Sequence, residues 1–227
     1  QLANDIDSIA AAVRETCGQQ VEPDGLDFIT KSVQAETIAE DAEYEGVRVR
    51  FLGKLGTARV TMQLDVGFGD VVVPGPVTLD FPTILDHPAP RLRGYTRESL
   101  VAEKLHVMVK RGILNSRMRD YFDVWTLSRQ FDFDGDVLTA AVHETFGRRG
   151  LRIPSEAVAL TGAFSRDPTK QSQWRGFVRK SRLEDVEGDL EVVVGGIAEF
   201  LGPVIRALHD GEEFKGRWSA PGPWIYF

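Results

Sequence analysis

The chain has 227 residues, a net charge of −7, 42% hydrophobic and 27% charged residues. This composition is typical of a globular protein and argues against a disordered chain or a membrane span. No apolar run approaches the roughly 20 residues of a membrane helix, and the first residues lack the basic start and apolar core of a signal peptide. The single Cys17 cannot form an internal disulfide, so we expect a cytoplasmic protein.

The charge is distributed unevenly along the chain. Residues 91–129 hold nine Lys and Arg against four Asp and Glu, whereas the rest of the chain is acidic. An acidic protein does not suit broad nucleic-acid binding, because attraction to phosphate comes from Lys and Arg. A local basic surface on an acidic protein suits an anionic ligand held at one site.

The N-terminal part of the chain is predicted to form one helix ahead of the first strand. Apolar spacing and a capping carboxylate, Asp5 or Asp7, predict a helix that ends at Gly18. Residues 26–33 are ambiguous, although Phe28 and its neighbours suggest a strand.

A β-hairpin is predicted next. Alternating apolar and polar residues predict strands over 47–52 and 57–66, joined by a turn over 53–56. A short strand is expected over 71–73. A proline-rich, irregular connection is expected over 80–93.

From Thr96 onward the pattern is helical. Thr96 and Ser116 are candidate N-caps, and Gly112 is expected to end the first helix. Helices are predicted over 96–110, 116–129, 134–146, 155–164, 171–177 and 191–209. The tail SAPGPWIYF is expected to pack through its aromatic side chains, which are Trp224, Tyr226 and Phe227. The order of elements predicts an α+β fold, with a β-rich domain over 1–94 and a helical domain over 95–227.

Asp65 is the first candidate catalytic residue. In the strand VTMQLDV, Val60 and the apolar residues that alternate with it share one face, and Asp65 lies on the other. A carboxylate near a strand end, before the flexible GFG turn, can hold a hard cation such as Mg²⁺. A polar residue on a solvated strand face explains the same pattern, and Asp70 after the turn is expected to be a loop cap.

Lys104 is the second candidate. It lies in the middle of an otherwise apolar helix stripe, formed by Leu100, Val101, Leu105 and Met108. A lysine in this position must be desolvated, paired, or extended along its stem to water. A phosphate contact inside a site and a lysine that reaches solvent are both consistent with the pattern.

The run SRMRDYFDVW is the third candidate. Asp120 and Asp123 are three residues apart, so they lie on one side of the helix. Arg117 and Arg119 lie in its first turn, where cations are unfavourable with the helix dipole unless an acidic partner or an anionic ligand is present. Met118, Phe122 and Trp125 are expected to form the buried face. An ordinary surface salt-bridge cluster is the alternative.

Other catalytic signatures are weak. The four histidines, which are His87, His106, His143 and His209, show no zinc-ligand spacing. There is no Walker loop, dinucleotide glycine pattern or GxSxG elbow. The pair Glu103-Lys104 after Asp65 loosely resembles a metal-dependent nuclease, but the residue that normally separates the acid from the lysine is missing.

Together these motifs resemble the AbiEii/AbiGii family of toxin-type nucleotidyltransferases. The run Ala102-Glu103-Lys104, followed after a short loop by the helix SRMRDYFDVW, resembles the family's paired-helix motif. The strand QLDVGFGD resembles its hydrophobic-Asp strand with a glycine-rich exit, and QWRGFVRK with a later FLGPV resembles its longer members. The resemblance covers about 47–203.

The resemblance implies a nucleotidyltransferase-like mixed β-sheet core followed by a helical C-terminal portion. It implies that Mg²⁺ and a nucleoside triphosphate (NTP) bind at three carboxylates, and that a substrate hydroxyl attacks the α-phosphate and releases pyrophosphate. Asp65 matches the third carboxylate, Lys104 would contact the triphosphate with Arg117 and Arg119, and Asp120 or Asp123 would complete the site. The implied partners are an NTP, a tRNA or protein acceptor and a cognate antitoxin, with no membrane.

One part of the family pattern is not found. Its glycine turn and D-x-D strand should precede the other motifs, and Asp5-Ile6-Asp7 lies in a segment with helical spacing and no upstream glycine turn. We therefore expect that the N-terminal part of the core is missing from this sequence. A protein that began at Gln1 would lack two metal ligands and be inactive.

Three functions remain open from the sequence. The first is an Mg²⁺-dependent nucleotidyltransferase toxin of a toxin–antitoxin pair. The second is a catalytically inactive relative that binds RNA or a partner protein. A nuclease is the third and has the least support.

Overall fold

A computed structural model describes residues 5–38, 46–183 and 189–227. The structure is mixed α+β, with 47% helix and 23% strand. It divides into two compact units, Gln1–Asp70 (unit 1) and Val71–Phe227 (unit 2). The α+β class is confirmed, and the described strands lie in three small antiparallel sheets. A nucleotidyltransferase-like mixed sheet and a domain boundary at 94/95 stay predictions.

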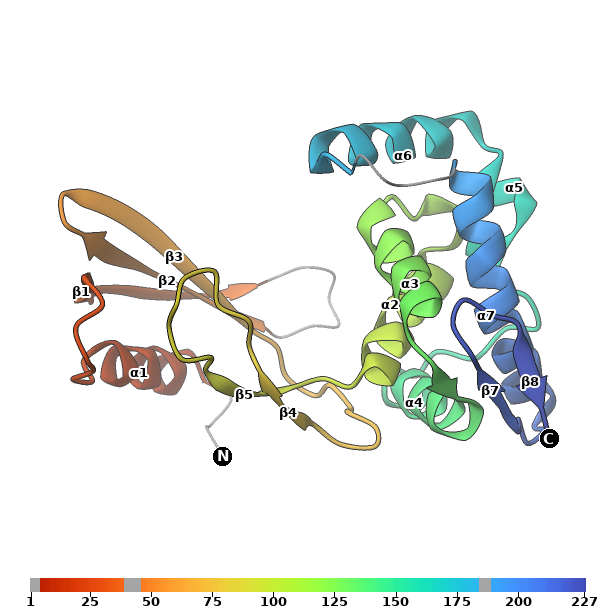
Figure 1. Ribbon diagram of the computed structural model, residues 1–227, viewed down its shortest axis with the longest axis horizontal. Coiled ribbons are helices and arrows are strands. Elements are labelled where there is room, and N and C mark those ends of the chain that lie inside the picture. Colours follow the sequence, from red (N-terminus) through yellow and green to blue (C-terminus); the bar gives the residue numbers. More distant parts are fainter. Residues whose placement is uncertain (1–4, 39–45, 184–188) are drawn as a thin grey trace. The chain divides into compact units, whose positions relative to one another are not determined.

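Unit 1 begins with helix α1, Ile6–Cys17 (Figure 1). The Asp5 carboxylate caps the helix by accepting a hydrogen bond from the Ser8 N–H at 2.8 Å, and Gly18 follows its last turn. The predicted helix is therefore confirmed, and Asp5 and Asp7 lie at a helix start rather than in a D-x-D strand.

The sheet of unit 1 has the order β1-β2-β3. Its strands are Leu26–Ile38, Gly46–Leu55 and Ala58–Val66. The hairpin is confirmed, but the predicted turn over 53–56 begins too early, because Gly53 pairs with Val60. The ambiguous segment 26–33 belongs to a strand. Val33, Val47 and Val49 pack against Ile9 and Ala10 of α1, and this contact forms the core of unit 1.

Unit 2 begins with a hairpin that the sequence patterns did not predict. Strands β4 (Val77–Asp80) and β5 (Arg91–Gly94) pair within the segment expected to be irregular. The strand predicted over 71–73 is absent from the described residues, where the Val73 backbone bonds the side chains of Thr96 and Ser99 instead of a neighbouring strand. The Val73 N–H donates to Ser99 Oγ at 2.9 Å, and the Val73 carbonyl accepts from Thr96 Oγ1 at 2.7 Å.

The helices of unit 2 largely confirm the predicted pattern. The long ones are α2 (Arg97–Arg111), α3 (Met118–Gln130), α4 (Gly135–Arg148), α6 (Pro168–Ser181) and α7 (Leu190–Asp210). The short ones are η1 (Gly112–Leu114), η2 (Val158–Leu160) and α5 (Gly162–Ser165). Thr96 caps α2 as predicted, whereas Arg117 rather than Ser116 precedes α3. The continuous helix predicted over 155–164 is wrong, because the extended backbone of Thr161 separates η2 from α5.

The last two strands of unit 2 belong to a small antiparallel sheet. It joins β6 (Phe133–Asp134), β7 (Gly216–Trp218) and β8 (Trp224–Tyr226). The prediction that the tail packs through its aromatic residues is correct for Trp224, which is buried and donates from Nε1 to the Phe200 carbonyl at 2.8 Å. Tyr226 and Phe227 remain exposed.

Helix α7 lies in the core of unit 2 and packs against α3, α4 and α5. It is long and apolar enough to meet the length and composition test for a membrane span, contrary to the sequence expectation. Its buried side chains, among them Ile197, Phe200 and Val204, are in contact with the other core residues of the unit, as in the core helix of a globular protein.

Candidate active site

The described site is a charged cluster between α2 and α3. Val101, Leu105 and Met108 are fully buried, so this part of the predicted stripe is directed inward with Lys104, whereas Leu100, which was predicted to share it, is exposed. The Lys104 ammonium donates to Asp120 Oδ1 at 3.0 Å and to Asp123 Oδ2 at 2.8 Å. The lysine predicted to be desolvated or paired is therefore both, with its side chain 15% exposed.

The local structure of α3 explains why both carboxylates contact one ammonium. Asp120 and Asp123 are separated by three residues, so they project from the same side of the helix. The core side of α3 buries Met118, Tyr121 and Val124. Phe122 and Trp125, which were expected to form the buried face with Met118, are partly buried and pack against the core.

Two arginines extend the cluster toward solvent. Arg117 Nε donates to Asp120 Oδ2 at 2.7 Å, so both oxygens of this nearly buried carboxylate are bonded. Arg119 Nε lies 3.8 Å from Asp123 Oδ2, and its side chain is 77% exposed. Three cations therefore accompany two carboxylates, and the excess positive charge lies at the exposed arginines, where a phosphate could approach.

Glu103, the neighbour of Lys104 in the AEK run, faces a different partner. Its Oε2 accepts from Arg149 Nη2 at 2.9 Å, with both side chains mostly buried. Glu103 therefore joins α2 to the end of α4, while Lys104 faces α3.

Asp65 lies in unit 1, on β3. Arg48, its partner across the β2–β3 pair, donates from Nε and Nη2 to the two carboxylate oxygens at 2.8 Å each. Gln63 Nε2 contributes a longer bond at 3.2 Å. The hydrogen bonds from Arg48 hold the pKa of the Asp65 carboxyl below its ordinary value of 3.8.

The described residues do not assemble a site for Mg²⁺. Within 5–38, 46–183 and 189–227, no three His, Cys, Asp or Glu side chains gather as ligands for one ion. Asp65 is bonded by Arg48, and Asp120 and Asp123 are bonded by Lys104. Hard divalent cations take several oxygen ligands, so these carboxylates do not by themselves fit the ion.

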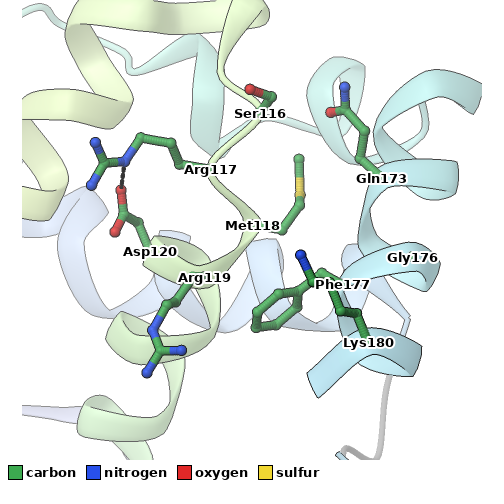
Figure 2. Close-up of a pocket in the computed structure, with 9 residues that line it drawn as sticks. All are labelled: Ser116, Arg117, Met118, Arg119, Asp120, Gln173, Gly176, Phe177 and Lys180. Atoms are coloured by element: carbon green, nitrogen blue, oxygen red, sulfur yellow. Dashed lines mark hydrogen bonds and ion pairs between the residues drawn. The ribbon is translucent and has the colours of Figure 1, made fainter. Parts of the chain in front are cut away.

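A pocket of about 450 Å³ adjoins the charged cluster. Figure 2 shows its two walls, one from the start of α3 and one from α6. Residues 116–120 form the first wall, with the guanidinium groups of Arg117 and Arg119 turned away from α6. The second wall consists of Gln173, Gly176, Phe177 and Lys180. All four lie in the run QWRGFVRK, which the sequence analysis noted only as a resemblance and did not assign to a site, although their spacing places them on one helix face.

Comparison with known proteins identifies the family. No curated protein matches the chain. A solved structure from H. pylori, provisionally assigned as a nucleotidyltransferase, is similar with 17% identity, coverage of 83% of this chain and 69% of that chain, and a TM-score of 0.38. The family described as "Nucleotidyl transferase AbiEii toxin, Type IV TA system" matches residues 1–194. The chain therefore belongs to the AbiEii family of nucleotidyltransferase toxins of type IV toxin–antitoxin systems.

Proposed function

We propose that this toxin transfers a nucleotide from an NTP to a hydroxyl group of RNA, at the acceptor end of tRNA, or of a protein, with release of pyrophosphate in the cytoplasm. Family membership supplies the reaction class, a nucleotide substrate and an antitoxin partner. The observation that carries the proposal is the cluster around Lys104, where a mostly buried ammonium lies between two carboxylates and beside two exposed arginines.

Lys104, Arg117 and Arg119 are the proposed triphosphate contacts. An ammonium has three N–H donors, and Asp120 and Asp123 accept two of them, so one donor is left for a phosphate oxygen. The carboxylates fix the position of the ammonium, which reduces the reorganisation needed when the transition state forms. Arg117 uses only Nε on Asp120, which leaves its other nitrogens for bidentate phosphate binding.

Asp65 is the proposed metal carboxylate, and Mg²⁺ is the proposed cofactor. Enzymes of this family generally use a divalent metal, which neutralises phosphate charge when bound. Asp65 could ligate the ion only after exchanging its bonds to Arg48. Because the described residues do not complete a metal site, no step of the reaction is assigned to the ion.

Label transfer tests the proposal directly. The protein is incubated with each of the four NTPs labelled at the α-phosphate, with Mg²⁺ and total tRNA, and RNA and protein are analysed separately. We expect label on one of the two acceptor classes. If nucleotide binds but no RNA or protein becomes labelled, transfer by this chain is contradicted, and a non-catalytic binding module is favoured.

A further inference from the structure

The pocket between α3 and α6 is large enough to hold a small molecule. Its volume of about 450 Å³ lies within the range of ligand pockets. Arg117 and Asp120 belong both to the pocket wall and to the charged cluster. A ligand in the pocket would therefore lie beside the charged cluster that is proposed to hold the triphosphate.

Phe177 gives the pocket an aromatic wall in a fixed position. Its ring packs against Phe122 and Trp174, with centroids 5.9 Å and 5.6 Å away. The side chain is half-buried, and its remaining surface lines the pocket with Met118. A flat aromatic ring held by its neighbours is the usual stacking partner of a nucleobase.

Two polar groups of α6 lack partners within the part of the chain that the structure describes. Gln173 Oε1 is buried and accepts no hydrogen bond there. Lys180 makes no hydrogen bond or ion pair with any described residue, and Figure 2 shows its side chain extending from α6 toward α3. An unsatisfied buried amide oxygen is costly, whereas the exposed Lys180 ammonium is solvated and can bind a ligand phosphate.

Gly176 leaves the space between these groups open. It lies inside α6, where glycine is the least favourable residue apart from proline, and a Cβ added there meets no atom within 4 Å. The glycine therefore has no packing reason to be present. Any larger residue would project into the pocket.

We infer that this pocket binds the base and ribose of the NTP, with Phe177 stacking on the base, the Gln173 amide at its polar edge and Lys180 on a phosphate. The inference rests on the proposed function and adds four α6 residues to its site. An open pocket of about 450 Å³ with a single aromatic wall suits one nucleotide, whereas single-stranded RNA needs a groove with successive stacking platforms.

The test compares Gly176→Leu with Gly195→Leu. Gly195 is an exposed helical glycine of α7 whose added Cβ also meets nothing within 4 Å, and it does not line the pocket. Binding of the α,β-methylene analogues of ATP, GTP, CTP and UTP is measured by calorimetry with Mg²⁺. We expect Gly176→Leu to weaken the best analogue by about tenfold or more, because stacking is lost. Gly195→Leu should bind like wild type, and inorganic tripolyphosphate should bind all three proteins alike.

A second pair of variants keeps the test valid if Gly176→Leu misfolds. Lys180→Ala should weaken analogue binding more than Arg179→Ala, because the neighbouring Arg179 does not line the pocket. Equal analogue binding by wild type and Gly176→Leu overturns the inference and leaves the proposed function intact. If the pocket variants lose only the binding of an RNA oligonucleotide, the pocket belongs to the acceptor, and the inference is also overturned. If no analogue binds wild type, both the inference and the proposed function are contradicted.

Discussion

Replacing Lys104 with methionine should destabilise unit 2 as well as remove a proposed phosphate contact. The substitution keeps the apolar stem but leaves Asp120, only 5% exposed, without its shortest link to α2. Removing one partner of a buried ion pair costs about 3–5 kcal/mol. Because Arg117 still bonds Asp120 and Asp123 is 26% exposed, we expect the lower limit, about 3 kcal/mol.

Tryptophan fluorescence measures this loss selectively in unit 2. All four tryptophans lie there, at Trp125, Trp174, Trp218 and Trp224. With a urea slope of about 2 kcal/mol/M, a loss of about 3 kcal/mol lowers the midpoint by about 1.5 M. Adding Asp120→Asn to Lys104→Met removes the buried charge and should recover about 1 kcal/mol or more. An unchanged midpoint in Lys104→Met, or a double variant no more stable than the single one, would refute the buried ion-pair reasoning.

Three further predictions follow from individual contacts. Asp65→Ala should abolish label transfer while the folded structure is retained, since the Asp65 side chain is 44% exposed and its strongest described partner is Arg48, and full activity would remove Asp65 from the site. Arg48→Gln should raise the pKa of Asp65 toward 3.8, as measured by carboxyl NMR titration. Because the pKa of Asp65 is lowered in the folded state, the Arg48–Asp65 pair stabilises the fold above about pH 4. This stabilisation is lost as the pH falls through the folded-state pKa. Tyr121→Phe should cost about 1 kcal/mol in urea unfolding, because it removes a buried hydroxyl bonded to the Ala159 carbonyl at 3.3 Å, and no change would show that this bond is not stabilising.

The charged cluster could be anticipated because it depends on local periodicity. Helix spacing placed Lys104 on an apolar stripe and put Asp120 and Asp123 on one side of the next helix. A lysine on a buried stripe needs a partner, and two carboxylates lay on the following helix. The sequence left open whether the cluster was a surface salt bridge. The burial of Asp120 answers this, because only the tertiary contact between α2 and α3 excludes water there.

The β4–β5 hairpin and the α6 wall could not be predicted in this way. The residues of β4, Val-Thr-Leu-Asp, alternate apolar and polar side chains, but four residues between prolines are too short a run to separate a strand from an irregular connection. The helix predicted over 171–177 ended before Lys180, and nothing local shows that α6 approaches α3. Both features depend on contacts between distant segments, and a single-sequence pattern carries no direct signal for such contacts.

The measurement that tests the central claim most directly is label transfer by Arg119→Gln. Arg119 is mostly exposed and only 3.8 Å from its nearest carboxylate, so its loss should leave the urea midpoint within about 0.5 kcal/mol of wild type. If the cluster around Lys104 binds the triphosphate, the transfer rate from α-labelled NTP should fall by about tenfold or more. A folded Arg119→Gln protein that transfers label at the wild-type rate would contradict the assignment of Arg119 to the nucleotide site.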